Sequence, residues 1–143
     1  MKKFVSPLAA FEYWEKNTPD KEFLRQYHSG KLDILTYKEA GIQARKAARF
    51  LKDQGLPKQS KIALLSKNCD FWVLADLAIM MSGHVSVPIY PTLKDDSIKP
   101  IIEHSESVLV FAGKLDQFEE QKEAFSSIRV VGSDKYTTPS EIS

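Results

Sequence analysis

Apolar and polar positions along the chain predict an N-terminal helix followed by a β-hairpin. Ser6 and Pro7 are typical of a helix start, because a serine side chain accepts a hydrogen bond from an early backbone N–H and the first turn does not need the donor that proline lacks. Apolar residues then recur at helical spacing. Residues 22–27 and 32–35 are two strand-like runs on either side of Gly30, which can take the positive φ that a tight turn requires.

A second helix is expected to begin at Thr36. Thr36 and Glu39 match the capping box, in which each side chain accepts a hydrogen bond from the backbone N–H of the other residue. Gly55 and Pro57 indicate where this helix ends. Small side chains on one face should allow the helix to lie close against a sheet. They belong to Ala40, Gly41, Ala44, Ala47 and Ala48.

Four short apolar runs alternate with helical patterns in the rest of the chain, and such unbroken runs are typical of strands covered on both faces of a parallel sheet. The expected strands are 62–65, 85–89, 108–111 and 128–131, and the expected helices are 71–81, one beginning at Asp95 or Asp96, and 115–125. Asn68 is the expected cap of the first of these helices, and Pro100 fits the second only in its first turn. The sequence therefore predicts an α/β fold: a parallel sheet with right-handed crossovers and helices on both faces, preceded by a helix and a β-hairpin.

Length, charge and cysteine content narrow the class of protein. A chain of 143 residues is long enough for one compact domain, and its net charge of +1 argues against a nucleic-acid partner held by bulk positive charge. The longest apolar stretch, residues 71–81, is shorter than the ~20 residues of a membrane span. Cys69 is the only cysteine, which excludes an intrachain disulfide. We expect a cytoplasmic protein without a membrane span.

Common motifs for phosphate binding and catalysis do not occur in the sequence. The six glycines are widely spaced, so neither GxGxxG nor a Walker loop is present. The three histidines do not form HExxH, and there is no GxSxG elbow. We interpret three further residues as structural: Cys69 as a buried residue at a helix start, Trp72 as core or interface, and His84 as a hydrogen-bonded loop residue.

One loop has two open interpretations. Residues 88–92, Pro-Ile-Tyr-Pro-Thr, leave the carboxyl end of an expected parallel strand. Ligands bind at that edge in open α/β sheets, which favours a binding loop. The two prolines equally favour a rigid connection without a binding role.

An ordered set of segments resembles the N-terminal portion of the adenylate-forming enzymes. These segments are residues 18–20, 35–39, 61–72, 83–93 and 108–111. Within that superfamily the set is most similar to long-chain fatty-acid–CoA ligases, and the likeness covers about residues 8–131. The spacing of residues 68–72 and 87–92 makes the ordered set specific. Residues 59–60 are Gln-Ser where the family usually has Gly-Asp, a departure that we expect to alter a turn only.

The resemblance implies a two-step reaction. In this family a carboxylate attacks the α-phosphorus of ATP to give an acyl-adenylate and pyrophosphate, and the CoA thiol then displaces AMP. The phosphate loop and the other catalytic motifs of the family do not occur in these 143 residues. We therefore expect an N-terminal fragment of a longer ligase, inactive alone, with residues 1–132 as an incomplete AMP-binding domain and 133–143 as a polar tail or truncated linker.

The resemblance also places a substrate near the open loop. In relatives of the acetyl type, the loop after the second core strand and a basic residue after the third lie near the CoA nucleotide. These positions correspond to Ile89, Tyr90, Pro91 and Lys114. No catalytic or metal-binding residue is expected in this chain.

Cofactors and partners follow from the same resemblance. ATP, Mg²⁺ and CoA are expected for the parent enzyme, and none for this chain alone. The expected partners are the rest of the enzyme, a fatty acid and CoA. Some long-chain relatives dimerise through the N-terminal segment, which implies a homodimer contact at Phe11 and Trp14. Peripheral association with the inner face of the membrane is left open beside the cytoplasmic location.

Two alternatives also stay open. The acid-selecting residues of this superfamily lie beyond this chain, so the parent enzyme could equally be an aryl-CoA ligase, a luciferase-like enzyme or a peptide-synthetase adenylation domain. The other alternative is a stand-alone α/β binding module, such as a receiver-like domain. A receiver needs acidic residues at its strand ends, and residues 66–68, Ser-Lys-Asn, provide none.

Overall fold

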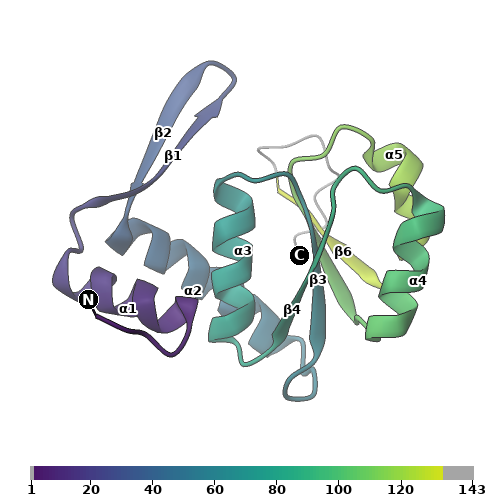
Figure 1. Ribbon diagram of the computed structural model, residues 1–143, viewed down its shortest axis with the longest axis horizontal. Helices are drawn as coiled ribbons and strands as arrows, with labels where there is room; N and C mark the ends of the chain where they lie inside the picture. The colour runs from purple at the N-terminus through teal and green to yellow at the C-terminus, as the bar shows by residue number, and fades with distance from the viewer. Residues whose placement is uncertain (1, 134–143) are drawn as a thin grey trace.

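The structure is a computed structural model that describes residues 2–133, so that of the predicted tail only Ser133 lies within the described residues. Figure 1 shows a parallel sheet between helices, with a helical pair and a hairpin at the N-terminal end. The elements are α1 (Pro7–Asn17), β1 (Glu22–His28), β2 (Lys31–Thr36), α2 (Tyr37–Asp53), β3 (Lys61–Leu65), α3 (Asp70–Met81), β4 (Val85–Ile89), α4 (Asp95–Ser105), β5 (Leu109–Ala112), α5 (Phe118–Gln121), the 3₁₀ helix η1 (Lys122–Phe125) and β6 (Arg129–Val131). Within residues 2–133, no helix is long and apolar enough to cross a membrane.

The capping signals at the starts of α1 and α2 act as the sequence predicts. The Ser6 hydroxyl accepts a 3.0 Å hydrogen bond from the Ala9 N–H and begins α1. At the start of α2, the Glu39 N–H donates to the Thr36 hydroxyl and the Thr36 N–H donates to the Glu39 carboxylate, at 3.2 and 3.0 Å. The hydrogen bond from the Thr36 backbone N–H, and after it the interaction with the Thr36 side chain, lower the pKa of Glu39. Gly30 has a φ of +80° in the hairpin turn, as expected.

The sheet is parallel, as predicted, with the strand order β4-β3-β5-β6. β3 is central and pairs with both β4 and β5, so that Leu64 lies opposite Pro88 on one side and Phe111 on the other. Among the described strands β4 lies at an edge. Pro88 is tolerated there because an edge strand needs backbone donors on one side only.

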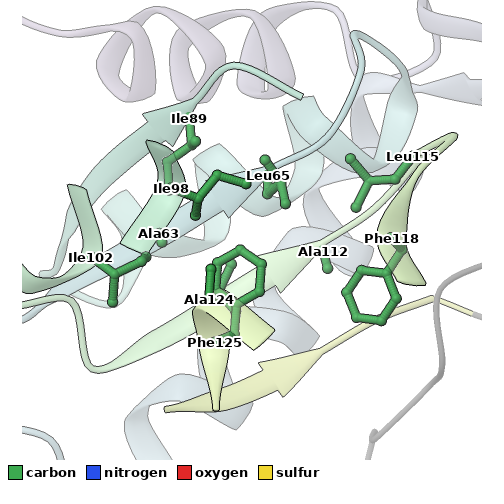
Figure 2. Close-up of a cluster of buried hydrophobic side chains, with 11 residues drawn as sticks. Ala63, Leu65, Ile89, Ile98, Ile102, Ala112, Leu115, Phe118, Ala124 and Phe125 are labelled. Carbon is green, nitrogen blue, oxygen red and sulfur yellow. The ribbon is translucent and has the colours of Figure 1, made fainter. Parts of the chain in front are cut away.

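The core has a layer on each face of the sheet, which confirms helices on both faces. Successive residues of β3 point to opposite faces, so Ala63 and Leu65 belong to one layer and Ile62 and Leu64 to the other. The first layer, drawn in Figure 2, joins the sheet to α4 and the segment from residue 115 to η1. The second joins it to α3 and the end of α2.

The small face of α2 does not lie against the sheet, which corrects the expectation. Ala40 and Ala44 pack with Leu77 of α3, and of the buried α2 residues it is Leu51, near the end of the helix, that reaches the sheet layer. The reason is that α3 already covers that face of the sheet (Figure 1). The small side chains therefore bring two helices together.

The expected helix 115–125 is wrong in extent and type. The chain forms the short helix α5 and then the 3₁₀ helix η1. Phe118, Gln121 and Ala124 are all buried, at a spacing of three residues. A repeat of three matches the 3₁₀ period, in which side chains at i and i+3 are aligned, better than the α-helical period of 3.6.

Two smaller expectations also fail. Cys69, not Asn68, is the cap residue of α3, and its side chain makes no capping hydrogen bond. Asn68 is exposed in the loop before it. Pro100 lies in the second turn of α4, not the first. Proline has no N–H to donate to the carbonyl of Asp96, four residues earlier. Pro100 is tolerated because both residues lie on the exposed face of the helix.

A buried polar contact connects the hairpin to the body. His28 Nε2 lies 2.9 Å from Asp70 Oδ2, and the side chains of the two residues are 14% and 5% exposed. The Asp33 carboxylate lies 3.8 Å from the same nitrogen. From the same strand, Gln26 Oε1 accepts a 3.3 Å hydrogen bond from the Asp70 N–H. The hairpin is therefore held at the first residue of α3.

Candidate functional site at the carboxyl edge of the sheet

A pocket of about 440 Å³ opens where the parallel strands β3 and β4 end. We call it the strand-end pocket. It is lined by Ser66, Asn68, Trp72, Pro88, Ile89, Tyr90 and Pro91. These residues come from the loop after β3, the first turn of α3, and the end of β4 with its following loop. This edge is where the topology of an open α/β sheet brings loops together around a ligand.

A buried hydroxyl holds two of the surrounding loops together. Ser66 is 2% exposed, and its Oγ accepts a 3.0 Å hydrogen bond from the Lys114 N–H. The same hydroxyl donates to the Lys67 carbonyl at 2.8 Å. The Lys67 N–H in turn donates to the Lys114 carbonyl at 2.8 Å. The loops after β3 and β5 are therefore hydrogen-bonded to each other beside the pocket.

Gly113 allows this connection. A Cβ atom at position 113 would lie 2.3 Å from Phe71 Cδ1 and 2.6 Å from Ser66 Oγ, both far below ordinary contact distance. The Gly113 N–H donates to the Leu65 carbonyl at 3.0 Å and continues the pairing of β5 with β3. Any larger residue would displace either the Phe71 ring or the serine hydroxyl.

The four predicted site residues do not all reach the pocket. Ile89, Tyr90 and Pro91 line it, but Lys114 does not. Lys114 is connected to the pocket through its backbone bond to Ser66. A second cation, Lys67, forms an ion pair with Asp116 across the same two loops.

The lining suits a flat, partly apolar group. Trp72 and Tyr90 present aromatic rings, two prolines and Ile89 add apolar surface, and Ser66 and Asn68 are polar. Tyr90 is 78% exposed, so its ring stands at the mouth of the pocket. Ligand sites commonly combine apolar and aromatic walls with few polar groups.

Sequence reasoning missed Ser66, Asn68 and Trp72 as lining residues. It assigned Asn68 to a helix cap and Trp72 to core or interface. A signal was present, because the rule that places ligands at the carboxyl ends of parallel strands applies to β3 as much as to β4. Applied to β3, the rule selects residues 66–68.

Two of the residues interpreted as structural, Cys69 and His84, are so in the fold. Cys69 is buried, with its sulfur 3.6 Å from Ser66 Oγ. His84 Nδ1 accepts a 3.2 Å hydrogen bond from the Ser60 N–H. In the described part of the chain, no three or more His, Cys, Asp or Glu side chains form a group that could hold a metal ion.

Two further pockets lie away from the strand ends. One, of about 360 Å³ between α1 and α2, is lined in part by Arg45 and Arg49, which already pair with Glu15 and Asp53. The other, of about 320 Å³, is apolar and shares Trp72 with the strand-end pocket. Phe11, expected at a homodimer contact, lines this apolar pocket but is only 4% exposed and belongs to the core.

Known proteins resemble this chain in sequence. The profile of one family, described as AMP-binding enzyme, matches residues 11–141. Fatty acyl-CoA synthetase A of Dictyostelium discoideum is 37% identical over 95 residues, 66% of this chain and 14% of that protein. Long-chain-fatty-acid–CoA ligase FadD15 of Mycobacterium bovis is 31% identical over 102 residues, 71% and 17%. Bacitracin synthase 3 of Bacillus licheniformis is 28% identical over 102 residues, 71% and 2%. The matched segment thus spans less than a fifth of each relative.

Solved structures support the same fold. A complex of VinN with L-aspartate has a TM-score of 0.76 at 18% identity, over 87% of this chain and 31% of that one. A fatty acyl-adenylate ligase from L. pneumophila, in complex with acyl adenylate and pyrophosphate, has a TM-score of 0.72 at 21% identity, over 87% and 22%. At these identities the likeness concerns the fold. Because the family profile covers most of the sequence, the chain belongs to the family of AMP-binding enzymes.

Proposed function

We propose that this chain forms the N-terminal part of a fatty-acid–CoA ligase, which converts ATP, a fatty acid and CoA into acyl-CoA, AMP and pyrophosphate. The observation that supports this most strongly is the 37% identity to a fatty acyl-CoA synthetase together with the family match. ATP and Mg²⁺ would be bound mainly by the rest of the enzyme, which carries the phosphate loop. In this proposal residues 1–132 are an incomplete domain.

Within that enzyme, the strand-end pocket would receive the nucleotide end of CoA. Adenine is flat and partly apolar, which fits the rings of Trp72 and Tyr90. The phosphates of CoA are anionic, which fits Lys114 and Lys67 on the adjoining loops. Asn68, an exposed residue of the lining, offers a side-chain amide for hydrogen bonding, whereas the Ser66 hydroxyl already bonds to Lys114 and Lys67.

Removing the exposed ring or the nearby cation should weaken the use of CoA. In an enzyme that carries this chain, we expect Tyr90→Ala and Lys114→Ala each to raise the KM for CoA about tenfold, because each removes one stacking or charge-assisted contact. The measurement is steady-state acyl-CoA formation at varied CoA concentration.

The first half-reaction provides the control, because adenylate formation does not use CoA. ATP–pyrophosphate exchange with a fatty acid should therefore be unchanged in both variants. An unchanged KM for CoA in both would remove the strand-end pocket from the CoA site, and a loss of exchange would show a general defect instead.

The chain by itself should not catalyse either step. We expect no fatty-acid-dependent ATP–pyrophosphate exchange from the purified 143-residue protein, because preorganised groups must surround the developing phosphate charge and this sequence lacks the family's phosphate loop. The same assay on a complete acyl-CoA ligase is the positive control. Exchange clearly above the no-enzyme rate would contradict the assignment.

A second candidate is an adenylation domain of a peptide synthetase, which the 28% identity to bacitracin synthase 3 favours. The two candidates differ in the acid that drives ATP–pyrophosphate exchange in the longer enzyme. Stimulation by a long-chain fatty acid supports the ligase, whereas stimulation by an amino acid supports the adenylation domain.

A further inference from the structure

Gln121 is a fully buried polar residue in a position where sequence reasoning expects an ordinary helical face. It closes the short helix α5, and none of its surface is exposed. Its Nε2 donates two hydrogen bonds, to the Pro91 carbonyl at 2.9 Å and to the Leu93 carbonyl at 2.8 Å. Both hydrogens of the amide are therefore used on one loop, about thirty residues away in sequence.

That loop is a tight turn beside the strand-end pocket. The Leu93 N–H donates to the Tyr90 carbonyl at 3.3 Å, and Pro91 follows Tyr90 at the turn position that proline favours. The Leu93 side chain packs against the first core layer, the one drawn in Figure 2. Tyr90 and Pro91, on the other side of the turn, line the pocket. The turn is thus closed by its own bond and fastened to the core by Leu93 and Gln121.

The chemistry of the amide fixes its orientation. Two carbonyl oxygens face it, and only the NH₂ group can donate to them. Its own Oε1 is buried and has no hydrogen-bond partner among the described residues. An unpaired buried acceptor costs stability, whereas an apolar residue of similar length would leave no such atom. The two hydrogen bonds to the turn offset the cost of this unpaired oxygen.

We propose that Gln121 is a positioning residue, which holds the turn of residues 90–93 so that Tyr90 and Pro91 form one wall of the strand-end pocket. Gln121 does not line the pocket, so it acts through the turn. The link to CoA rests on the proposed function, whereas the link to the turn rests on the two hydrogen bonds alone.

The test uses Gln121→Met in the 143-residue chain, because methionine has similar length and no donor. We expect the Leu93 amide hydrogen to exchange with solvent about tenfold faster than in the parent protein, since a turn that loses two hydrogen bonds opens more often. Amide exchange followed by NMR measures this directly, residue by residue.

The use of CoA is measured in an enzyme that carries this chain, because CoA is expected for that enzyme and not for this chain alone. We expect Gln121→Met to raise the KM for CoA about tenfold and to leave fatty-acid-dependent ATP–pyrophosphate exchange unchanged. If Tyr90→Ala and Lys114→Ala leave the KM for CoA unchanged, the proposed CoA site fails, and the Leu93 exchange rate still decides the role of Gln121.

A second variant provides a rescue that a purely structural role would not give. In Gln121→Glu a carboxylate faces two carbonyl oxygens at neutral pH, and burial would raise the pKa of this new side chain. The protonated acid can donate one hydrogen bond. Compared with the parent at the same pH, slow exchange at Leu93 should therefore return as the pH falls toward ~4.3, the ordinary value for glutamate.

Phe125→Leu is the matched control, because it weakens the same core layer without removing either hydrogen bond. Phe125→Leu should lower the free energy of global unfolding. It should not make the Leu93 amide hydrogen exchange faster than this loss of global stability accounts for. The proposal is overturned if Gln121→Met and Phe125→Leu change Leu93 exchange and the KM for CoA equally. It is also overturned if Gln121→Met folds and leaves both unchanged. Should Gln121→Met fail to fold, Gln121→Glu decides by whether its exchange recovers at low pH.

Discussion

Replacing His28 with alanine is expected to lower the free energy of unfolding by about 3 kcal/mol, because it leaves a buried carboxylate without its imidazole partner. Asp70 is 5% exposed, and its Oδ2 lies 2.9 Å from His28 Nε2. Its other oxygen still accepts from the Phe71 N–H at 2.8 Å, which compensates only part of the loss. Urea unfolding followed by circular dichroism gives the value.

A double-mutant cycle separates this contact from the hairpin's own stability. Asp70→Asn keeps an oxygen for the Phe71 N–H but removes the charge, so His28→Ala should cost clearly less in that background. Lys31→Ala is the control, because Lys31 is the exposed cross-strand neighbour of His28 and should change stability by less than about 0.5 kcal/mol. A coupling energy near zero would show that the contact does not hold the hairpin.

Gly113→Ala should cost about 3 kcal/mol, at the upper end of what overpacking by one methyl group produces. The new Cβ would lie 2.3 Å from Phe71 Cδ1 and 2.6 Å from Ser66 Oγ. Neither neighbour yields easily, because the serine hydroxyl holds the Lys114 N–H and the phenylalanine ring packs against the core. Thermal or urea unfolding measures the loss.

Relief of the clash tests the reason for the effect. Phe71→Ala removes the nearest atoms, so adding it to Gly113→Ala should destabilise less than the sum of the two single changes. Gly113→Ala should also weaken the hydrogen bond between the Lys114 N–H and the Ser66 hydroxyl, beside the strand-end pocket. Faster exchange of the Lys114 amide hydrogen would show this. Strict additivity of the two substitutions would mean that the methyl group is accommodated elsewhere.

The features that the sequence predicts well depend on neighbours within about four residues. The capping box of Thr36 and Glu39, the serine start of α1 and the positive φ of Gly30 are all of this kind. Unbroken apolar runs also indicated buried parallel strands, because a strand covered on both faces needs no polar alternation. These signals gave the element order and both helical layers.

The errors arise where a distant segment decides the local conformation. Residues 115–125 have an amphipathic pattern typical of one helix, yet the core aligns Phe118, Gln121 and Ala124 at a spacing of three. The small face of α2 is similar, since the pattern shows that a close neighbour exists but not that the neighbour is α3. Periodicity reports which side of an element is buried and is silent on what covers it.

The sequence by itself determined the starts of α1 and α2, the parallel strands, and the place of residues 89–91 at the carboxyl edge of the sheet, because these follow from short-range hydrogen bonding and burial. Only the tertiary structure decided that Ser66 holds the loop of Lys114, that His28 holds the hairpin to Asp70, and that Gln121 holds the turn at Leu93. Each of these contacts joins residues that are 28 to 48 positions apart. A polar side chain carries no local sign of a partner that folding brings to it from so far along the chain.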